Sequence, residues 1–166
     1  QQDEETHVKQ IQSLPFWKKY FLPFWALVLL LSLNNSVFAV EEPPLPDTFA
    51  NHKVVLQISD PNPFKQTLVL NVANNLLKHY GVGEVDLEIV AFGPGLRLMM
   101  EGNVNTKRMQ ALMDTGVRFS GCANTLSNFT KKLGHRPNLV DGVTVVPAGA
   151  ARILQLNAAG YQILKP

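Results

Sequence analysis

The stretch GVRFSGCANT, residues 116–125, decides how the rest of the chain is interpreted. Its first half is typical of a strand that ends at a glycine, and its second half begins a helix. The only cysteine, Cys122, therefore falls in the first turn of a predicted helix, directly after a predicted strand. Unpartnered backbone N–H groups and the positive end of the helix dipole gather there, and both favour a thiolate over a thiol. The stretch predicts a nucleophilic cysteine.

A purely structural interpretation of the same cysteine stays open. Cys122, Leu126, Phe129 and Leu133 recur at steps of four, three and four, which is the spacing of one apolar helix face. Free cysteine also packs well as a small buried hydrophobic residue. A single cysteine forms no intramolecular disulfide, so Cys122 is a free thiol, an intermolecular bridge or a carrier of another group.

Composition indicates one globular domain and excludes several classes of function. The 166 residues are 46% hydrophobic and 17% charged, with a formal charge of +2, and the basic residues are scattered. We therefore expect no nucleic-acid partner. The sequence has no phosphate-binding glycine loop that ends in lysine, no paired-cysteine or His-x-x-x-His metal spacing and no Gly-x-Ser-x-Gly elbow. We expect neither a cofactor nor a metal.

The first 39 residues predict an N-terminal extension followed by an export signal. Lys18 and Lys19 precede an apolar run at 21–33, and Val37-Phe38-Ala39 has the small residues that signal peptidase prefers. The run is short for a membrane span, although a retained anchor remains the alternative. We expect cleavage before Val40, a periplasmic or secreted protein, and no stable membrane insertion after cleavage. Residues 40–51 are proline-rich and predict an extended tether that leads into a domain at 52–166.

Strands and helices alternate through this domain, and that order predicts an α/β sandwich with a mainly parallel sheet of about five strands. In such sheets ligands lie outside the carboxyl ends of the strands, where the predicted loops are 59–62, 92–97, 120–124 and 146–150. Residues 96–100 fit a short helix and an extended segment equally well. The expected strands are 53–59, 85–92, a third that ends just before Cys122, 143–146 and 161–164. The expected helices end at Gly81, Gly116, Gly134 and Gly160, and the first two begin after caps at Asn62 and Asn105.

Several segments carry a resemblance to a known family. They are residues 53–60, the AFGPGL turn at 91–96, GVRF at 116–119 with CANT at 122–125, and VVPAG at 145–149 with the glycine–tyrosine pair at 160–161. Together they resemble the exported branch of the DsrE/DsrF-like sulfur-relay family over essentially all of 52–166. The resemblance implies a three-layer α/β/α fold, assembly into trimers or hexamers, and a persulfide carried on the cysteine after the third strand, which is Cys122.

Two functions follow as expectations. In the first, Cys122 is the nucleophile of a sulfur carrier with sulfurtransferase-like activity, and a donor or acceptor protein is its partner. In the second, the chain is a non-catalytic homo-oligomeric binding module that uses the same cleft. Arg97 and Asn124 lie in loops beside the expected site and suit an anionic sulfur species, although each also fits a surface charge or a helix cap, and Gly93 and Gly95 let backbone approach a ligand. We predict a lowered pKa and a partly accessible thiol for Cys122.

Overall fold

The structure is a computed structural model and describes residues 40–166, so the predicted extension and signal peptide at 1–39 lie outside the described residues. Within the described part of the chain, no helix is both long and apolar enough to cross a membrane.

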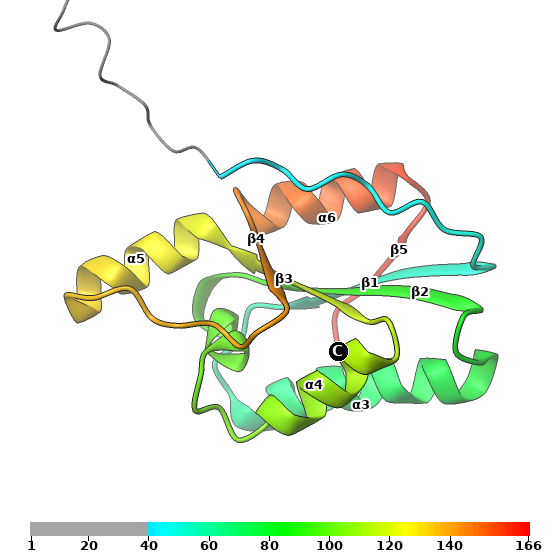
Figure 1. Cartoon of the computed structure of the whole chain (residues 1–166), viewed down its shortest axis with the longest axis horizontal. Helices are drawn as coiled ribbons and strands as arrows, with labels where there is room; N and C mark the ends of the chain where they lie inside the picture. Colours follow the sequence, from blue (N-terminus) through cyan, green and yellow to red (C-terminus); the bar gives the residue numbers. More distant parts are fainter. Residues whose placement is uncertain (1–39) are drawn as a thin grey trace, which may run out of the picture. The chain divides into compact units, whose positions relative to one another are not determined.

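Five strands form one sheet in the order β4-β3-β2-β1-β5, and every neighbouring pair is parallel. The predicted α/β architecture with about five strands is therefore confirmed, and the predicted element boundaries hold to within a few residues. Figure 1 shows the arrangement of the elements. In chain order they are β1 (His52–Ile58), α3 (Pro63–Tyr80), β2 (Val85–Ala91), the 3-10 helix η1 (Gly93–Met99), α4 (Thr106–Asp114), β3 (Arg118–Cys122), α5 (Ala123–Leu133), β4 (Val143–Val146), α6 (Gly149–Ala158) and β5 (Gln162–Leu164).

Of the two predicted helix caps, one is present in the structure and the other is not. The Asn62 side chain accepts the N–H of Phe64 and caps α3, as its position before a proline predicts. Asn105 precedes α4, but its side chain makes no capping hydrogen bond; the side chain of Asn103 instead accepts the N–H of Asn105 at 2.9 Å. Of residues 96–100, for which the sequence favoured neither a helix nor an extended segment, all but Met100 belong to η1, and Met100 is its extended C-cap residue.

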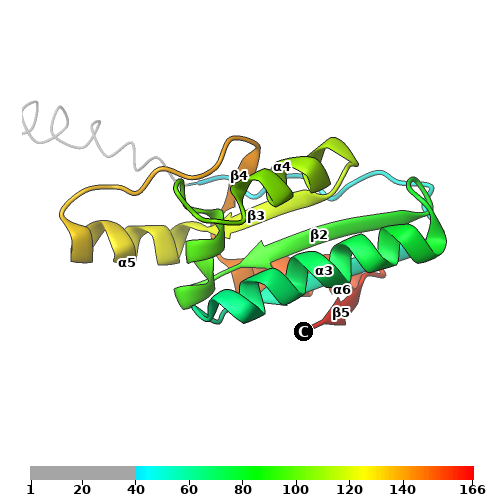
Figure 2. The ribbon, with the colours of Figure 1, turned by 90° about the horizontal axis from the view of Figure 1, so that it is seen from below.

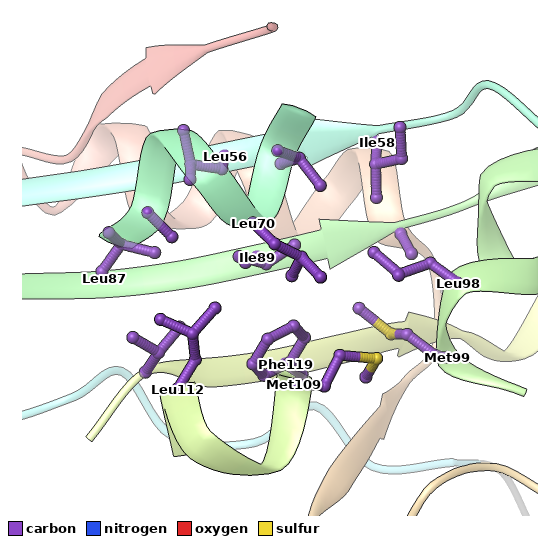
Figure 3. Close-up of a cluster of buried hydrophobic side chains, with 14 of the residues drawn as sticks. Leu56, Ile58, Leu70, Leu87, Ile89, Leu98, Met99, Met109, Leu112 and Phe119 are labelled. Atoms are coloured by element: carbon purple, nitrogen blue, oxygen red, sulfur yellow. The ribbon is translucent and has the colours of Figure 1, made fainter. Parts of the chain in front are cut away.

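Helices cover both faces of the sheet and give three layers (Figure 1). α3 and α4 pack on one face over a large apolar cluster, in which Leu70 and Met109 meet Ile89 and Phe119 of the central strands (Figure 3). α6 packs on the other face through Ile153 and Leu156, over a much smaller cluster. The face beneath α6 is therefore the one that has room for polar side chains.

A buried ion pair occupies much of that second face. Glu88 of β2 is 0% exposed and accepts Arg152 Nε at 2.9 Å, Arg152 Nη2 at 3.1 Å and Ser120 Oγ at 2.7 Å. Arg118, its neighbour on β3, also pairs with Glu88 at 3.2 Å. Burial raises the pKa of Glu88, but the hydrogen bonds from Arg152 and Ser120 and the charges of the two arginines outweigh burial, so the pKa lies below its usual value.

Arg152 also fixes the proline-rich lead-in. Its Nη1 donates to the carbonyl of Pro43 at 2.9 Å and its Nη2 to the carbonyl of Pro44 at 3.5 Å. Residues 40–51 contain no helix or strand, as predicted, but they are docked on the domain and do not form a free tether. The sequence did not predict this contact because its two ends are 109 residues apart.

α5 extends away from the carboxyl edge of the sheet, and its far end lies apart from the other helices in both views (Figures 1 and 2). Leu126 is its buried residue, Phe129 is partly buried, and Leu133 near its end is exposed. The helix therefore presents most of its length to solvent in the single chain.

Candidate functional site

Cys122 is the last residue of β3 and the residue from which α5 begins. Strand alternation turns its side chain toward the α6 face, where the start of α6 covers it. A Cβ added to Gly149 would lie 3.3 Å from the Cβ of Cys122, so the two backbones meet closely. The cysteine is 5% exposed and thus more enclosed than the partly accessible thiol that the sequence predicted.

Hydrogen-bond donors surround the sulfur. Burial raises the pKa of the Cys122 thiol, but the N–H of Gly149, the hydroxyl of Thr125 and the N–H groups of Thr125 and Asn124 lower it by more. The pKa therefore lies below the usual cysteine value. The Cys122 side chain makes no capping hydrogen bond to α5, although Cys122 is the N-cap residue. The groups that lower the pKa act by stabilising negative charge on the sulfur.

Thr125 links the thiol to the loop after β2. Its Oγ1 accepts the N–H of Gly93 at 2.8 Å, and its hydroxyl is one of the groups that lower the pKa of Cys122. Thr125 was not among the predicted site residues. Thr125 lies three residues after Cys122, and a side chain that completes a helix cap usually lies at that spacing. This spacing was the signal in the sequence.

Arg118 does not reach the thiol, because its guanidinium lies 2.5 Å from Asp86 and 3.2 Å from Glu88. Asn124 has an exposed side chain, and only its backbone N–H acts on Cys122.

The two predicted glycines have different roles. Gly93 donates to Thr125 as described, whereas Gly95 lies against the end of β1, where an added Cβ would be 2.5 Å from the carbonyl oxygen of Ile58. The absence of a side chain at Gly95 therefore serves the packing of η1.

A pocket of about 250 Å³ lies between η1 and α5, next to Thr125. It contains two cationic side chains, and no carboxylate lines it. The guanidinium of Arg97 lies over the Phe129 ring, 5.5 Å from its centroid. The lining residues are Gly93, Pro94 and Arg97 of η1 with Thr125, Asn128, Phe129 and Lys132 of α5.

Three larger hollows also lie in the described part of the chain. One, of about 460 Å³, runs between α3 and α4, a second, of about 470 Å³, lies beside β5, and a third, of about 420 Å³, lies beside β4 and the loop before it. None of the three is lined by Cys122 or by Thr125, so their size does not make them the site. Within residues 40–166, no three His, Cys, Asp or Glu side chains gather where they could hold a metal ion.

Comparison with solved structures places the fold among known proteins. A protein of unknown function, MTH1491 from Methanobacterium thermoautotrophicum, is 26% identical with a TM-score of 0.62, and the match covers 69% of this chain and 99% of that one. YchN from E. coli is 16% identical with a TM-score of 0.54 over the same shares. Both have the DsrE-like fold, so the predicted resemblance is confirmed at the level of the fold. No protein-family model and no curated protein sequence matches the chain.

Proposed function

We propose that the chain is a sulfur carrier with the DsrE-like fold, in which Cys122 accepts sulfane sulfur as a persulfide and passes it to a partner. The observation that supports this is the set of donors around Cys122, which lowers the pKa of a thiol at the carboxyl edge of the sheet. Such a thiol is a thiolate more often than a free cysteine is, and the thiolate is the nucleophilic form.

The transfer needs no outside oxidant or reductant. The thiolate attacks the outer sulfur of a persulfide donor, RS–SH; a sulfur–sulfur bond forms on Cys122 while the donor's sulfur–sulfur bond breaks, and RS⁻ leaves with the electron pair. The proton stays on the transferred sulfur. This sulfur extends about 2 Å beyond the original one, which suits a cysteine whose own side chain is 5% exposed.

We also propose that the protein acts as a homo-oligomer, a trimer or a hexamer. In support, α5 leaves the sheet with most of its surface uncovered, and Leu133 is 52% exposed. A neighbouring copy packed on α5 would cover this surface and enclose the pocket next to Thr125. Export to the periplasm or beyond remains part of the proposal on the basis of the sequence of residues 1–39.

Mass spectrometry tests the central proposal. The protein is exposed to polysulfide, and the peptide that contains Cys122 is searched for the mass of one added sulfur atom. We expect the addition in the native protein and none in Cys122→Ser. If native Cys122 remains unmodified while the unfolded chain is modified, the cysteine is a core residue, and a non-catalytic binding module becomes the better description.

A further inference from the structure

We propose that the pocket between η1 and α5 binds a small organic anion, a low-molecular-weight thiol or persulfide that carries carboxylates, and presents it to Cys122. The role of this ligand as sulfur donor rests on the function proposed above. The binding of the ligand rests on the pocket alone.

The charges that line the pocket select the sign of its ligand. Arg97 and Lys132 approach it from opposite walls, one on η1 and the other on α5, and no carboxylate lies between them. Arg97 is held by its position over Phe129 and forms no salt bridge with any residue of 40–166. A guanidinium with free donors binds a carboxylate through two parallel hydrogen bonds. Asn128 adds an amide to the same wall.

The size and the apolar part of the pocket favour an organic ligand. A volume of about 250 Å³ is several times the roughly 30 Å³ that one water molecule occupies in the liquid. The pocket is therefore larger than an inorganic anion requires. The Phe129 ring and Pro94 supply apolar surface that suits the carbon skeleton of an organic acid.

Thr125 connects this pocket with the thiol. It lines the pocket, and its hydroxyl is one of the groups that lower the pKa of Cys122. The N–H of Gly93, on the opposite wall, holds the Thr125 hydroxyl in this orientation at 2.8 Å. A persulfide whose carboxylates are bound by the two cations would direct its outer sulfur to Cys122 for the transfer written above.

Binding is measured first in the full chain carrying Cys122→Ser, so that no covalent step contributes. The probe is reduced glutathione, a thiol with two carboxylates, and amide NMR shifts report where it binds. We expect shifts confined to η1 and the first three turns of α5. Arg97→Gln and Lys132→Gln should each weaken binding about tenfold, the effect of one charge-assisted hydrogen bond. Lys131→Gln removes the same charge from the same turn without lining the pocket, and it should bind like the parent.

Three results would overturn the proposal. They are the absence of shifts at the pocket, an equal loss of affinity in Lys131→Gln, and displacement of glutathione by an equal concentration of thiosulfate. The third would make the pocket a site for inorganic anions.

A second measurement separates this proposal from the function on which it builds. With Cys122 restored, glutathione persulfide should modify Cys122 more slowly in Arg97→Gln than in the native protein, whereas inorganic polysulfide should modify both equally. Equal rates with glutathione persulfide would overturn the donor role. If Cys122 takes sulfur from neither donor while Cys122→Ser still binds glutathione, the sulfur-carrier function fails and the assignment of the pocket stands.

Discussion

Replacing Thr125 with valine tests whether the donors around Cys122 set its reactivity. Valine keeps the shape of the side chain but removes both the hydroxyl that lowers the pKa of Cys122 and the acceptor of the Gly93 N–H. A hydrogen bond to a charged group contributes roughly 1.5–3 kcal/mol, and a sulfur acceptor belongs near the lower limit. Because about 1.4 kcal/mol is a factor of ten, the thiolate population at neutral pH should fall about tenfold.

The assay is the rate of alkylation of Cys122 by iodoacetamide as a function of pH. In the native protein the rate should rise with pH at lower values than for a free cysteine, because the pKa of Cys122 is lowered. In Thr125→Val the whole curve should move to higher pH. Near neutral pH the rate should be about tenfold lower, and at high pH, where both thiols are ionised, the two rates should converge.

Thr130→Val is the matched control. Thr130 lies on the same helix and donates its hydroxyl to the Leu126 carbonyl at 2.9 Å, but it does not act on Cys122. Its substitution should leave the alkylation curve unchanged. A Thr125→Val curve that overlays the native one, or an equal displacement in Thr130→Val, would show that the hydroxyl of Thr125 does not tune the thiol.

Further predictions concern the fold, its pH dependence, its assembly and its processing. Gly95→Ala should lower the free energy of unfolding by about 1–3 kcal/mol, because the added Cβ would lie 2.5 Å from the carbonyl oxygen of Ile58. Gly102→Ala has open space around it and should cost about 1–2 kcal/mol for its positive φ alone. Urea unfolding compares the two variants. Arg152→Met should cost about 3–5 kcal/mol in the same assay, because it leaves the Glu88 carboxylate buried without its main partner. Because the pKa of Glu88 is lowered, its carboxylate stabilises the folded state above the unfolded value of 4.5, and this stabilisation is lost as the pH falls through the folded value. A free energy of unfolding that stays constant on acidification, or that falls equally in Glu88→Gln, would contradict this. Light scattering should give a trimer or hexamer at micromolar concentration, and a monomer mass would count against the assembly. N-terminal sequencing of exported protein should begin at Val40, and a chain that keeps 21–33 in the membrane fraction would contradict cleavage.

The elements of the fold could be predicted because their signals are local. Asn62 before Pro63 caps α3, and Gly81 and Gly134 end α3 and α5 with positive φ. Each of these signals acts within a few residues of its position in the sequence. The same kind of evidence placed Cys122 at the junction of strand and helix, although it predicted the first turn of the helix and the structure has the last residue of β3, which is the N-cap of α5.

The chemistry around Cys122 could not be predicted to the same extent. The contact between Gly149 and Cys122 requires β4 to pair with β3 and α6 to cross the sheet, and neither is encoded locally. Glu88 and Arg152 are 64 residues apart, so the alternation of residues along β2 could not predict that they form an ion pair. The burial of Cys122 was underestimated for the same reason, since the residue that covers it comes from a distant helix.

The pairing of β1 with β5 determines when the domain can finish folding. Val54 pairs with Gln162 and Leu56 with Leu164, so the first strand of the domain closes against the last one. During synthesis β1 to β4 can assemble as their helices form, but one edge of β1 stays open until β5 has left the ribosome. Contacts between residues so far apart in sequence slow folding. A chain truncated before β5 would expose the β1 edge to other chains, so it should aggregate even though the residues around Cys122 are intact.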